Sequence, residues 1–305
     1  MASGLRHQGC LYGSDAEFLA MAVPFVRDGL ARGEPVLVAT TSANLELLHE
    51  AMGPEADGVD YAEAAYFGRR PPQRATAIHE YWNRHHEAVR VIAEPMWTGR
   101  SRREIEAWQR MEAGLNVVLA DADIRLICPY DTRIVAPGIA EDACRTHPEL
   151  VVGAAAGPSP QFMAPADFVR THRTAGALDV AADVFHFDGD LAAVRRYVLD
   201  RATPLLRSED DVATFGIAVG ESITYLLGHG VTCVSVWVRA AAGRVVCTLH
   251  SDQSLALYPF VGFRHGDALW LTNQICEWLD VSSDAGGCTV ELAVPGHRAA
   301  EAFGV

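Results

Sequence analysis

The chain has 305 residues, a formal net charge of −14 and 25 basic residues, all of which are arginine. The absence of lysine excludes a lysine Schiff base, a Walker A phosphate-binding lysine and the strand lysine of eukaryotic-type protein kinases. An acidic chain without a basic run is poorly suited to bind a phosphate backbone, so we expect no direct contact with nucleic acid. The start of the chain lacks a signal-peptide pattern, and no apolar run reaches the ~18–20 residues of a membrane span. We therefore expect a cytoplasmic protein that makes no contact with a membrane.

Cysteine and histidine spacing gives no local sign of a metal site. The seven cysteines are scattered, without CxxC pairs. His79, His85 and His86 are close in sequence but lie on different faces of a helix, and no HExxH motif is present. On this basis we assign no metal ion.

Strand and helix patterns alternate through the first half of the chain. Continuous apolar runs of strand length are typical of strands that are buried on both faces of a parallel sheet. Ser14 and Ser42 each precede a helical pattern and are candidate N-caps. The predicted elements are, in order, strand 8–12, helix 17–31, strand 35–40, helix 42–52, strand 89–94, helix 103–119 and strand 124–131. This alternation predicts an α/β fold with a mostly parallel sheet.

Ligands of parallel sheets usually bind at the carboxyl ends of the strands. In this sequence those ends carry Glu94, Trp97, Tyr130 and Asp131, and no glycine-rich phosphate loop follows them. A carboxylate beside an indole offers a small molecule one polar and one apolar contact, so we predict a sensory ligand site at these residues. The alternative is structural: Glu94 and Asp131 cap neighbouring helices, and Trp97 fills the edge of the sheet.

The composition changes after residue 152, where small residues and prolines predict a linker at 153–182. The second half then has strand 185–187, helices 190–200 and 211–228, strands 233–240 and 244–250, helix 269–279 and strand 288–294. Helices followed by antiparallel strands predict an α+β two-layer sandwich. The expected organisation is thus a first domain at 1–152, the linker, and a second domain at 183–297.

The first domain resembles the MEDS sensory domain, a module that also occurs in actinobacterial regulators. The resemblance covers roughly residues 5–152 and depends on the order and spacing of several short elements rather than on one decisive motif. These elements are His7 with Cys10-Leu11-Tyr12, GLARGEPVLV (29–38), EPMW (94–97), Glu112 with Asn116, CPYD (128–131) and THPEL (146–150). The resemblance implies a RecA-like α/β fold that lacks the nucleotide loop and senses a signal or a small molecule.

The second domain resembles the GHKL ATPase fold of the anti-sigma regulatory serine kinases, so the whole chain is similar to RsbA-like regulators. FGIAVGESITYLLGHG (215–230) stands at the N-box helix, and VVCTLHSDQS (245–254) stands at the adenine box. GDALWLTNQICEWLDV (266–281) stands at the glycine-rich lid box and the helix that follows it, and GGCTVEL (286–292) matches the closing strand. The resemblance implies Glu221 as the general base, and Asp252 and Gly266 as ATP-binding positions.

The ATP-binding boxes depart from the family pattern in three places. Tyr225 stands where the N-box has its magnesium-binding asparagine, and a phenol is a weak neutral ligand for magnesium. In the adenine box Ser254 replaces a glycine. In the lid box Ala268 replaces the second glycine, and Asp267 would add negative charge beside a triphosphate. These departures predict a pseudokinase without a nucleotide cofactor, in which Glu221 is inactive.

Three functions remain open from the sequence. The favoured one is a regulator of a sigma-factor switch that binds a sigma factor or an anti-anti-sigma protein without ATP-dependent catalysis. The first alternative is an active serine protein kinase that uses Mg-ATP with Glu221 as base. The second is a small-molecule sensor whose output is homodimerisation.

Overall fold

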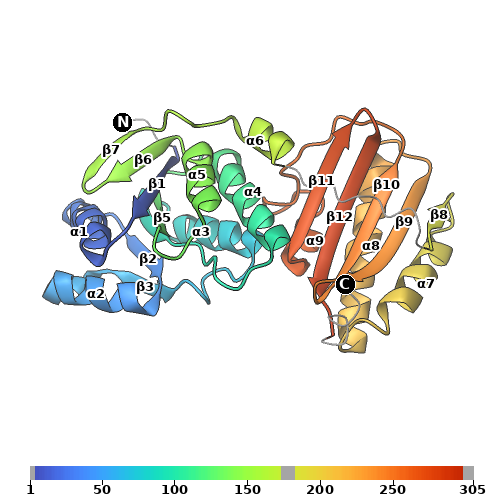
Figure 1. The fold of residues 1–305 in the computed structure, drawn as a ribbon, viewed down its shortest axis with the longest axis horizontal. Coiled ribbons are helices and arrows are strands. Elements are labelled where there is room, and N and C mark those ends of the chain that lie inside the picture. The colour runs from blue at the N-terminus through green and yellow to red at the C-terminus, as the bar shows by residue number, and fades with distance from the viewer. Residues whose placement is uncertain (1–3, 173–182, 298–305) are drawn as a thin grey trace. The chain divides into compact units, whose positions relative to one another are not determined.

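The computed structural model describes residues 4–172 and 183–297 (Figure 1). Within it the chain divides into two compact units, Met1–Arg173 and Thr174–Val305. Each unit has its own sheet, one mostly parallel and one antiparallel. The prediction of a mostly parallel α/β sheet followed by a separate antiparallel sheet with helices is therefore confirmed.

The first unit contains seven strands, one 3-10 helix and six α-helices among its described residues. Its elements are, in order, β1 (Arg6–Tyr12), α1 (Asp15–Ala31), β2 (Val36–Thr40), α2 (Ser42–Met52), η1 (Gly53–Gly58), β3 (Asp60–Glu63), α3 (Pro71–His85), β4 (Val89–Ala93), α4 (Arg102–Val118), β5 (Ile124–Asp131), α5 (Pro137–Thr146), β6 (Glu149–Val152), β7 (Ala155–Pro158) and α6 (Pro165–Thr171).

The strands of this sheet follow the order β3-β2-β4-β5-β1-β6-β7. All neighbours are parallel except β6 and β7, which pair antiparallel. Strand β1 lies between β5 and β6, with Gly9 opposite Cys128 on one side and Leu150 on the other. The carboxyl ends of β1, β2, β4 and β5 therefore meet along one edge of the sheet.

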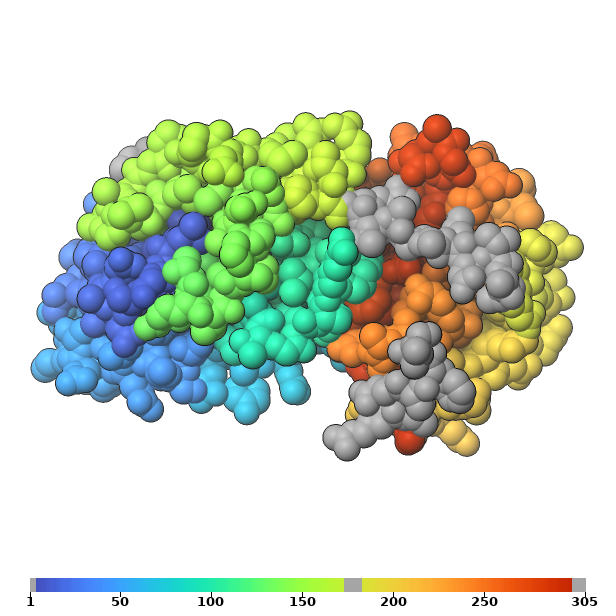
Figure 2. Space-filling view, viewed as in Figure 1, coloured from blue at the N-terminus to red at the C-terminus, as the bar shows by residue number. Residues whose placement is uncertain are grey.

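Helices cover both faces of the sheet, which explains its continuous apolar strands. All residues of β2 and β4 are buried. Helices α1 and α2 pack on one face through a core that includes Phe18, Leu48 and Ile127. Helices α3, α4 and α5 pack next to one another on the other face, against β4 and β1. The space-filling view shows the green residues of α5 and the yellow-green residues of the β6–β7 hairpin on the face of this unit that is turned to the viewer (Figure 2).

The N-caps of the first two helices follow the sequence pattern with one difference. The Ser14 side chain accepts a hydrogen bond from the Glu17 amide, as predicted for α1. Helix α2 is capped by Thr41 rather than Ser42, because the Thr41 hydroxyl accepts from the Asn44 amide and Ser42 is already helical. Serine and threonine are both favourable N-cap residues, so the sequence alone does not show whether Thr41 or Ser42 caps the helix.

Residues 153–171 contain more regular structure than the predicted linker implies. Strand β7 extends the sheet beyond β6, and α6 follows it. The Phe168 side chain of α6 is 1% exposed. The remainder of the predicted linker, 173–182, lies outside the described residues.

The second unit contains a five-stranded sheet and three described α-helices. Its elements are β8 (Phe185–Phe187), α7 (Leu191–Ala202), α8 (Glu209–Gly228), β9 (Val234–Ala241), β10 (Arg244–Ser251), α9 (Trp270–Ile275), β11 (Trp278–Asp284) and β12 (Gly287–Pro295). The sheet order is β11-β12-β10-β9-β8, with every pair antiparallel. Alternate residues of β10 (Val245, Cys247, Leu249) share one core with α7 and α8.

The predicted helix at 269–279 is wrong in its second half. Only Trp270–Ile275 is helical, and β11 begins at Trp278. Strand β11 pairs with β12 across a tight hairpin, so that Leu279 faces Leu292 and Val281 faces Val290. The alternation of buried and less buried residues in β11 suits a strand, and this long-range pairing overrides the local helical spacing.

Among the residues that the structure describes, no helix combines the length and apolarity needed to cross a bilayer.

Candidate functional site

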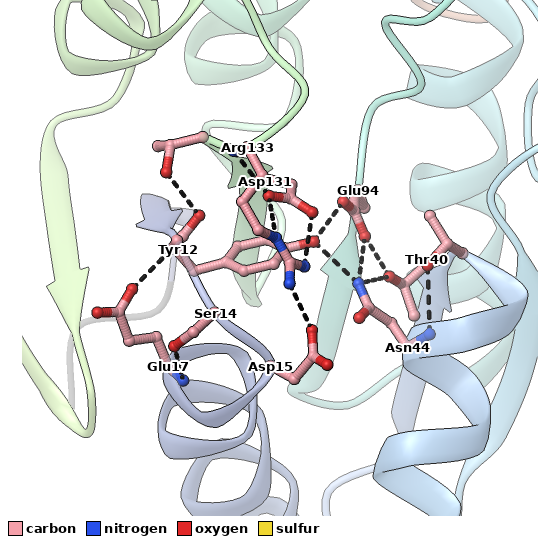
Figure 3. Close-up of polar contacts among 12 residues, drawn as sticks. Tyr12, Ser14, Asp15, Glu17, Thr40, Asn44, Glu94, Asp131 and Arg133 are labelled. Carbon is pink, nitrogen blue, oxygen red and sulfur yellow. Dashed lines mark hydrogen bonds and ion pairs between the residues drawn. The ribbon is translucent and has the colours of Figure 1, made fainter.

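Polar side chains from three parallel strands surround the buried carboxylate of Glu94. Glu94 directly follows β4 and is 3% exposed. The Tyr12 hydroxyl, at the end of β1, donates to its Oε1 at 2.8 Å. The Thr40 hydroxyl, at the end of β2, donates to its Oε2 (Figure 3). The ends of three strands thus place polar groups around Glu94.

Asn44 of α2 completes this cluster. Its Nδ2 lies within hydrogen-bond distance of Glu94 Oε2 (3.1 Å), Tyr12 Oη (2.9 Å) and Thr40 Oγ1 (3.2 Å). Burial, reinforced by the Glu94 carboxylate, raises the pKa of Tyr12 well above its usual range, so the phenol keeps the proton that it donates. The donors to Glu94 in this cluster are all neutral groups.

Asp131 forms a second polar group at the same edge. Arg133 binds it through two of its three side-chain nitrogens, Nε to Oδ1 at 2.8 Å and Nη2 to Oδ2 at 2.7 Å. Arg133 Nη1 also donates to Asp15 of α1 at 2.7 Å. The Arg133 guanidinium holds the pKa of Asp131 below its usual range. Asp131 therefore anchors a loop to the start of α1.

Trp97 and Tyr130 belong to an aromatic cluster. Their rings stack with centroids 5.8 Å apart, and Trp97 also meets Trp108 of α4 edge to face. Of the four residues predicted to bind a ligand, Glu94, Trp97, Tyr130 and Asp131 are 3%, 7%, 2% and 8% exposed. The structure thus brings Trp97 and Tyr130 into contact, and it engages Glu94 and Asp131 in separate internal hydrogen bonds. A ligand at these residues stays a prediction.

A further group of chemically active side chains lies deeper in the first unit, and the sequence analysis did not identify it as a site. It consists of His7 from β1, Glu112 from α4, Cys128 from β5 and His147 directly after α5. One nitrogen, oxygen or sulfur atom from each residue lies within 4.8 Å of the other three. His7, Glu112, Cys128 and His147 are 2%, 2%, 1% and 0% exposed. We call these four residues the buried cluster.

Burial and mutual charge set the protonation of the buried cluster. Burial, aided by His147, lowers the pKa of His7. Burial alone would raise the pKa of Glu112, but the imidazoles of His147 and His7 outweigh it and lower the value to about 2. Burial, and then the Glu112 carboxylate, raise the pKa of the Cys128 thiol well above its usual range. The cluster therefore holds the Glu112 carboxylate beside His7 and Cys128, whose neutral forms are favoured.

The His147 ring packs closely against the backbone of Gly9, which has no side chain. A Cβ at Gly9 would lie 3.1 Å from Cγ and 3.3 Å from Nδ1 of His147. The rings of His7 and His147 stand with centroids 4.1 Å apart. A side chain at position 9 would therefore displace the imidazole from the cluster.

In the second unit, Glu221 of α8 contacts the start of α9. Its Oε2 accepts from the Thr272 amide at 2.8 Å and from the Thr272 hydroxyl. Tyr225, one turn later, is 9% exposed and packs against the His229 ring with centroids 4.4 Å apart. Tyr225 is thus part of the hydrophobic core of the second unit.

The other predicted ATP-binding positions lie in segments without regular structure. Asp252 follows β10, is fully exposed, and lies with Oδ1 3.2 Å from Nε2 of His250. Ser254 Oγ lies 3.4 Å from Ser283 Oγ. Gly266 has a positive φ of 87° with open space where a Cβ would stand, while Asp267 caps its own turn by accepting from the Arg264 amide. Ala268 is exposed. Whether these residues bind a nucleotide stays a prediction.

Comparison with solved structures gives a partial likeness. The chain is similar to the RsbU and RsbW domains of Rv1364c from Mycobacterium tuberculosis, with 15% identity and a TM-score of 0.29. This likeness covers 38% of the present chain and 33% of that one, so the chain spans about a third of its length. No curated protein matches the sequence. Residues 6–148, which carry both clusters of the first unit, match the family described as MEDS, the methanogen/methylotroph, DcmR sensory domain.

Proposed function

We propose that the chain is a regulator in a sigma-factor switch. It binds a sigma factor or an anti-anti-sigma protein through its second unit and does not transfer phosphate. The first unit senses a small molecule and modulates that binding. The description of the matched family as a sensory domain supports this second role.

The contact between Glu221 and Thr272 is the observation that carries the proposal. A general base must reach the hydroxyl from which it takes a proton. Glu221 instead accepts two hydrogen bonds from the first turn of α9. In this position the Glu221 carboxylate holds α9 in place. To act as a general base, Glu221 would first have to break its hydrogen bonds to Thr272, which costs free energy.

The surroundings of Glu221 favour the same conclusion. Tyr225 is buried against His229, where a magnesium ligand would need to point toward a phosphate. The segment around Gly266 carries the Asp267 carboxylate, which opposes the charge of a triphosphate. Each feature weakens nucleotide binding by a separate physical route.

Calorimetric titration of the full chain with Mg-ATP tests the catalytic half of the proposal. We expect no binding tighter than a Kd of about 100 μM, which corresponds to ~5.5 kcal/mol. The matched variant is the triple substitution Tyr225→Asn, Asp267→Arg and Ala268→Gly, which should raise the affinity. Tight binding by the unmodified chain, with phosphate transfer lost in Glu221→Gln, would establish an active kinase instead.

The binding half requires purified partners. Sigma factors and anti-anti-sigma proteins from the same genome are titrated one at a time into the full chain, with and without Mg-ATP. We expect saturable binding to at least one of them and no dependence on nucleotide. If none of them binds and the chain dimerises when a small molecule is added, a sensor that acts through homodimerisation replaces the proposal.

A further inference from the structure

Three contacts within the buried cluster have the spacing of ligand atoms that share one zinc ion. His7 Nε2 lies 3.4 Å from Glu112 Oε2 and 3.4 Å from Cys128 Sγ. His147 Nε2 lies 3.4 Å from the same Glu112 oxygen. Zinc bonds of 2.0–2.3 Å in a tetrahedral site place neighbouring ligand atoms about 3.3–3.6 Å apart. The three distances of 3.4 Å match this spacing, and all four donor atoms lie within 4.8 Å of one another.

The other nitrogen of each imidazole is engaged by an acceptor. His147 Nδ1 lies 2.7 Å from the Ala143 carbonyl, which can only accept, so this nitrogen carries the proton. His7 Nδ1 lies 3.1 Å from Oδ1 of Asn116. The orientation of that amide is fixed because its Nδ2 donates to the Thr146 carbonyl at 2.8 Å. In their neutral forms both histidines thus direct the Nε2 lone pair into the cluster.

This arrangement directs several acceptor atoms at one point. Among the described residues, Glu112 Oε2 and His147 Nε2 are buried side-chain atoms without a hydrogen-bond partner. Two imidazole lone pairs and a carboxylate oxygen repel one another unless a positive charge lies between them, and burying such a group is costly. Histidines that bind metals typically donate their second N–H to a carbonyl or carboxylate, as both do here.

We propose that His7, Glu112, Cys128 and His147 bind one zinc ion at the centre of the first unit. Binding replaces the thiol proton of Cys128 with a zinc–sulfur bond and releases that proton to solvent. Zinc with one thiolate and one carboxylate carries no net charge, so the ion removes the repulsion without burying a new charge.

The donor set favours zinc over magnesium and calcium. Thiolate and imidazole are ligands for zinc, whereas magnesium and calcium prefer six or more oxygen ligands. Four protein ligands complete a tetrahedron and leave no open position for substrate, which is typical of a structural site. The ion joins two strands, β1 and β5, to helix α4 and to the end of α5. This inference is independent of what the second unit binds.

The test uses the full chain, stripped with a chelator and then loaded with zinc or cobalt. We expect one zinc per chain by elemental analysis, and a rise in melting temperature on zinc addition. Cobalt substitution should give a thiolate-to-metal charge-transfer band. These measurements on the unmodified chain remain informative even if a variant fails to fold.

Matched variants then locate the ion. Cys128→Ser should abolish the cobalt band and stoichiometric zinc, whereas Cys10→Ser, which changes a buried cysteine outside the cluster, should keep both. Asn116→Ala should weaken zinc binding by about 10–100-fold, as losing an outer-shell partner does. Absence of zinc from the loaded chain, a cobalt spectrum without a thiolate band, or zinc retained at full affinity in Cys128→Ser would each overturn the proposal.

Discussion

The Glu221 carboxylate accepts two hydrogen bonds from a single residue, Thr272, and so ties α8 to the start of α9. Helix α9 has only six residues and lacks a side-chain cap of its own. First-turn amides of a helix need an acceptor, and a carboxylate from another helix supplies it here. The residue that the resemblance assigns to catalysis therefore performs a capping role.

Replacing Thr272 measures that role. Thr272→Val keeps the shape of the side chain but removes the hydroxyl that contacts Glu221 and the Ala218 carbonyl. We expect a loss of about 1–3 kcal/mol in the free energy of unfolding of the second unit, because buried acceptors lose a donor. Denaturant unfolding of the full chain provides the measurement. Thr272→Ser retains the hydroxyl and should cost clearly less; equal losses in the two variants would show that the hydroxyl does not matter.

Tyr12→Phe tests the polar cluster around Glu94. The substitution removes a donor to the buried carboxylate and an acceptor for Asn44, so we expect a destabilisation of about 1–3 kcal/mol. The matched control is Tyr61→Phe, because Tyr61 Oη is buried without a hydrogen-bond partner among the described residues. Deleting that hydroxyl should be neutral or slightly stabilising. Thermal unfolding provides the measurement. A lower melting temperature for Tyr61→Phe than for Tyr12→Phe would contradict this account.

Gly9→Ala tests the fit of His147 against β1. The added methyl would stand 3.1 Å from His147 Cγ, and overpacking of this kind costs about 1–3 kcal/mol. Gly157→Ala in β7 is the control, since nothing lies within 4 Å of a Cβ there. We expect its unfolding free energy to stay within about 0.5 kcal/mol of the unmodified chain. Similar losses in both variants would point to a backbone effect and not to contact with His147.

The ion pair between Asp131 and Arg133 should make stability depend on pH in a defined direction. Arg133 holds the pKa of folded Asp131 below the value of about 3.9 that an unfolded aspartate has. The resulting stabilisation is present above that unfolded value and is lost as the pH falls through the lower folded value.

Unfolding of Asp131→Asn at a series of pH values checks the sign. The variant should be less stable than the unmodified chain at neutral pH, and the difference should shrink as the solution becomes acidic. Asp57→Asn, which alters an exposed carboxylate, is the control for general charge effects. A difference that stays constant down to acid pH would show that the ion pair contributes nothing.

Most strands were predictable because their burial leaves a strong local signal. Strand β5 has the predicted bounds, and each of its eight residues except Arg125 is buried. Strand β11 was missed because its partner lies beyond a turn, and pairing with β12 decides its conformation. The spacing of apolar residues from Trp270 to Leu279 is helical and does not indicate that pairing, because periodicity reflects only contacts between residues that are close in sequence.

The buried cluster shows the same limit for a site. Its residues are far apart along the chain: 105 positions separate His7 from Glu112, 16 separate Glu112 from Cys128, and 19 separate Cys128 from His147. A search for local metal motifs cannot find them, because the pairing of β1 with β5 and the packing of α4 and α5 bring them together. A signal was nevertheless present: each of the four lies in a short segment on which the resemblance to the sensory family depends. The polar convergence at Glu94 was foreseeable, because the ends of parallel strands must meet.

The two outer strands of the first sheet limit how copies of this protein can associate. Exposed strand edges invite pairing with another chain, and short strands, charges and prolines oppose it. Strand β3, at one edge, has four residues that begin with Asp60 and end with Glu63, while β7, at the other, is equally short and ends at Pro158. Extension of the sheet from one molecule into the next is therefore disfavoured at both margins. A homodimer that formed through the first unit would have to use helical or loop surfaces, and amyloid-like stacking through this sheet is opposed by the same edge residues.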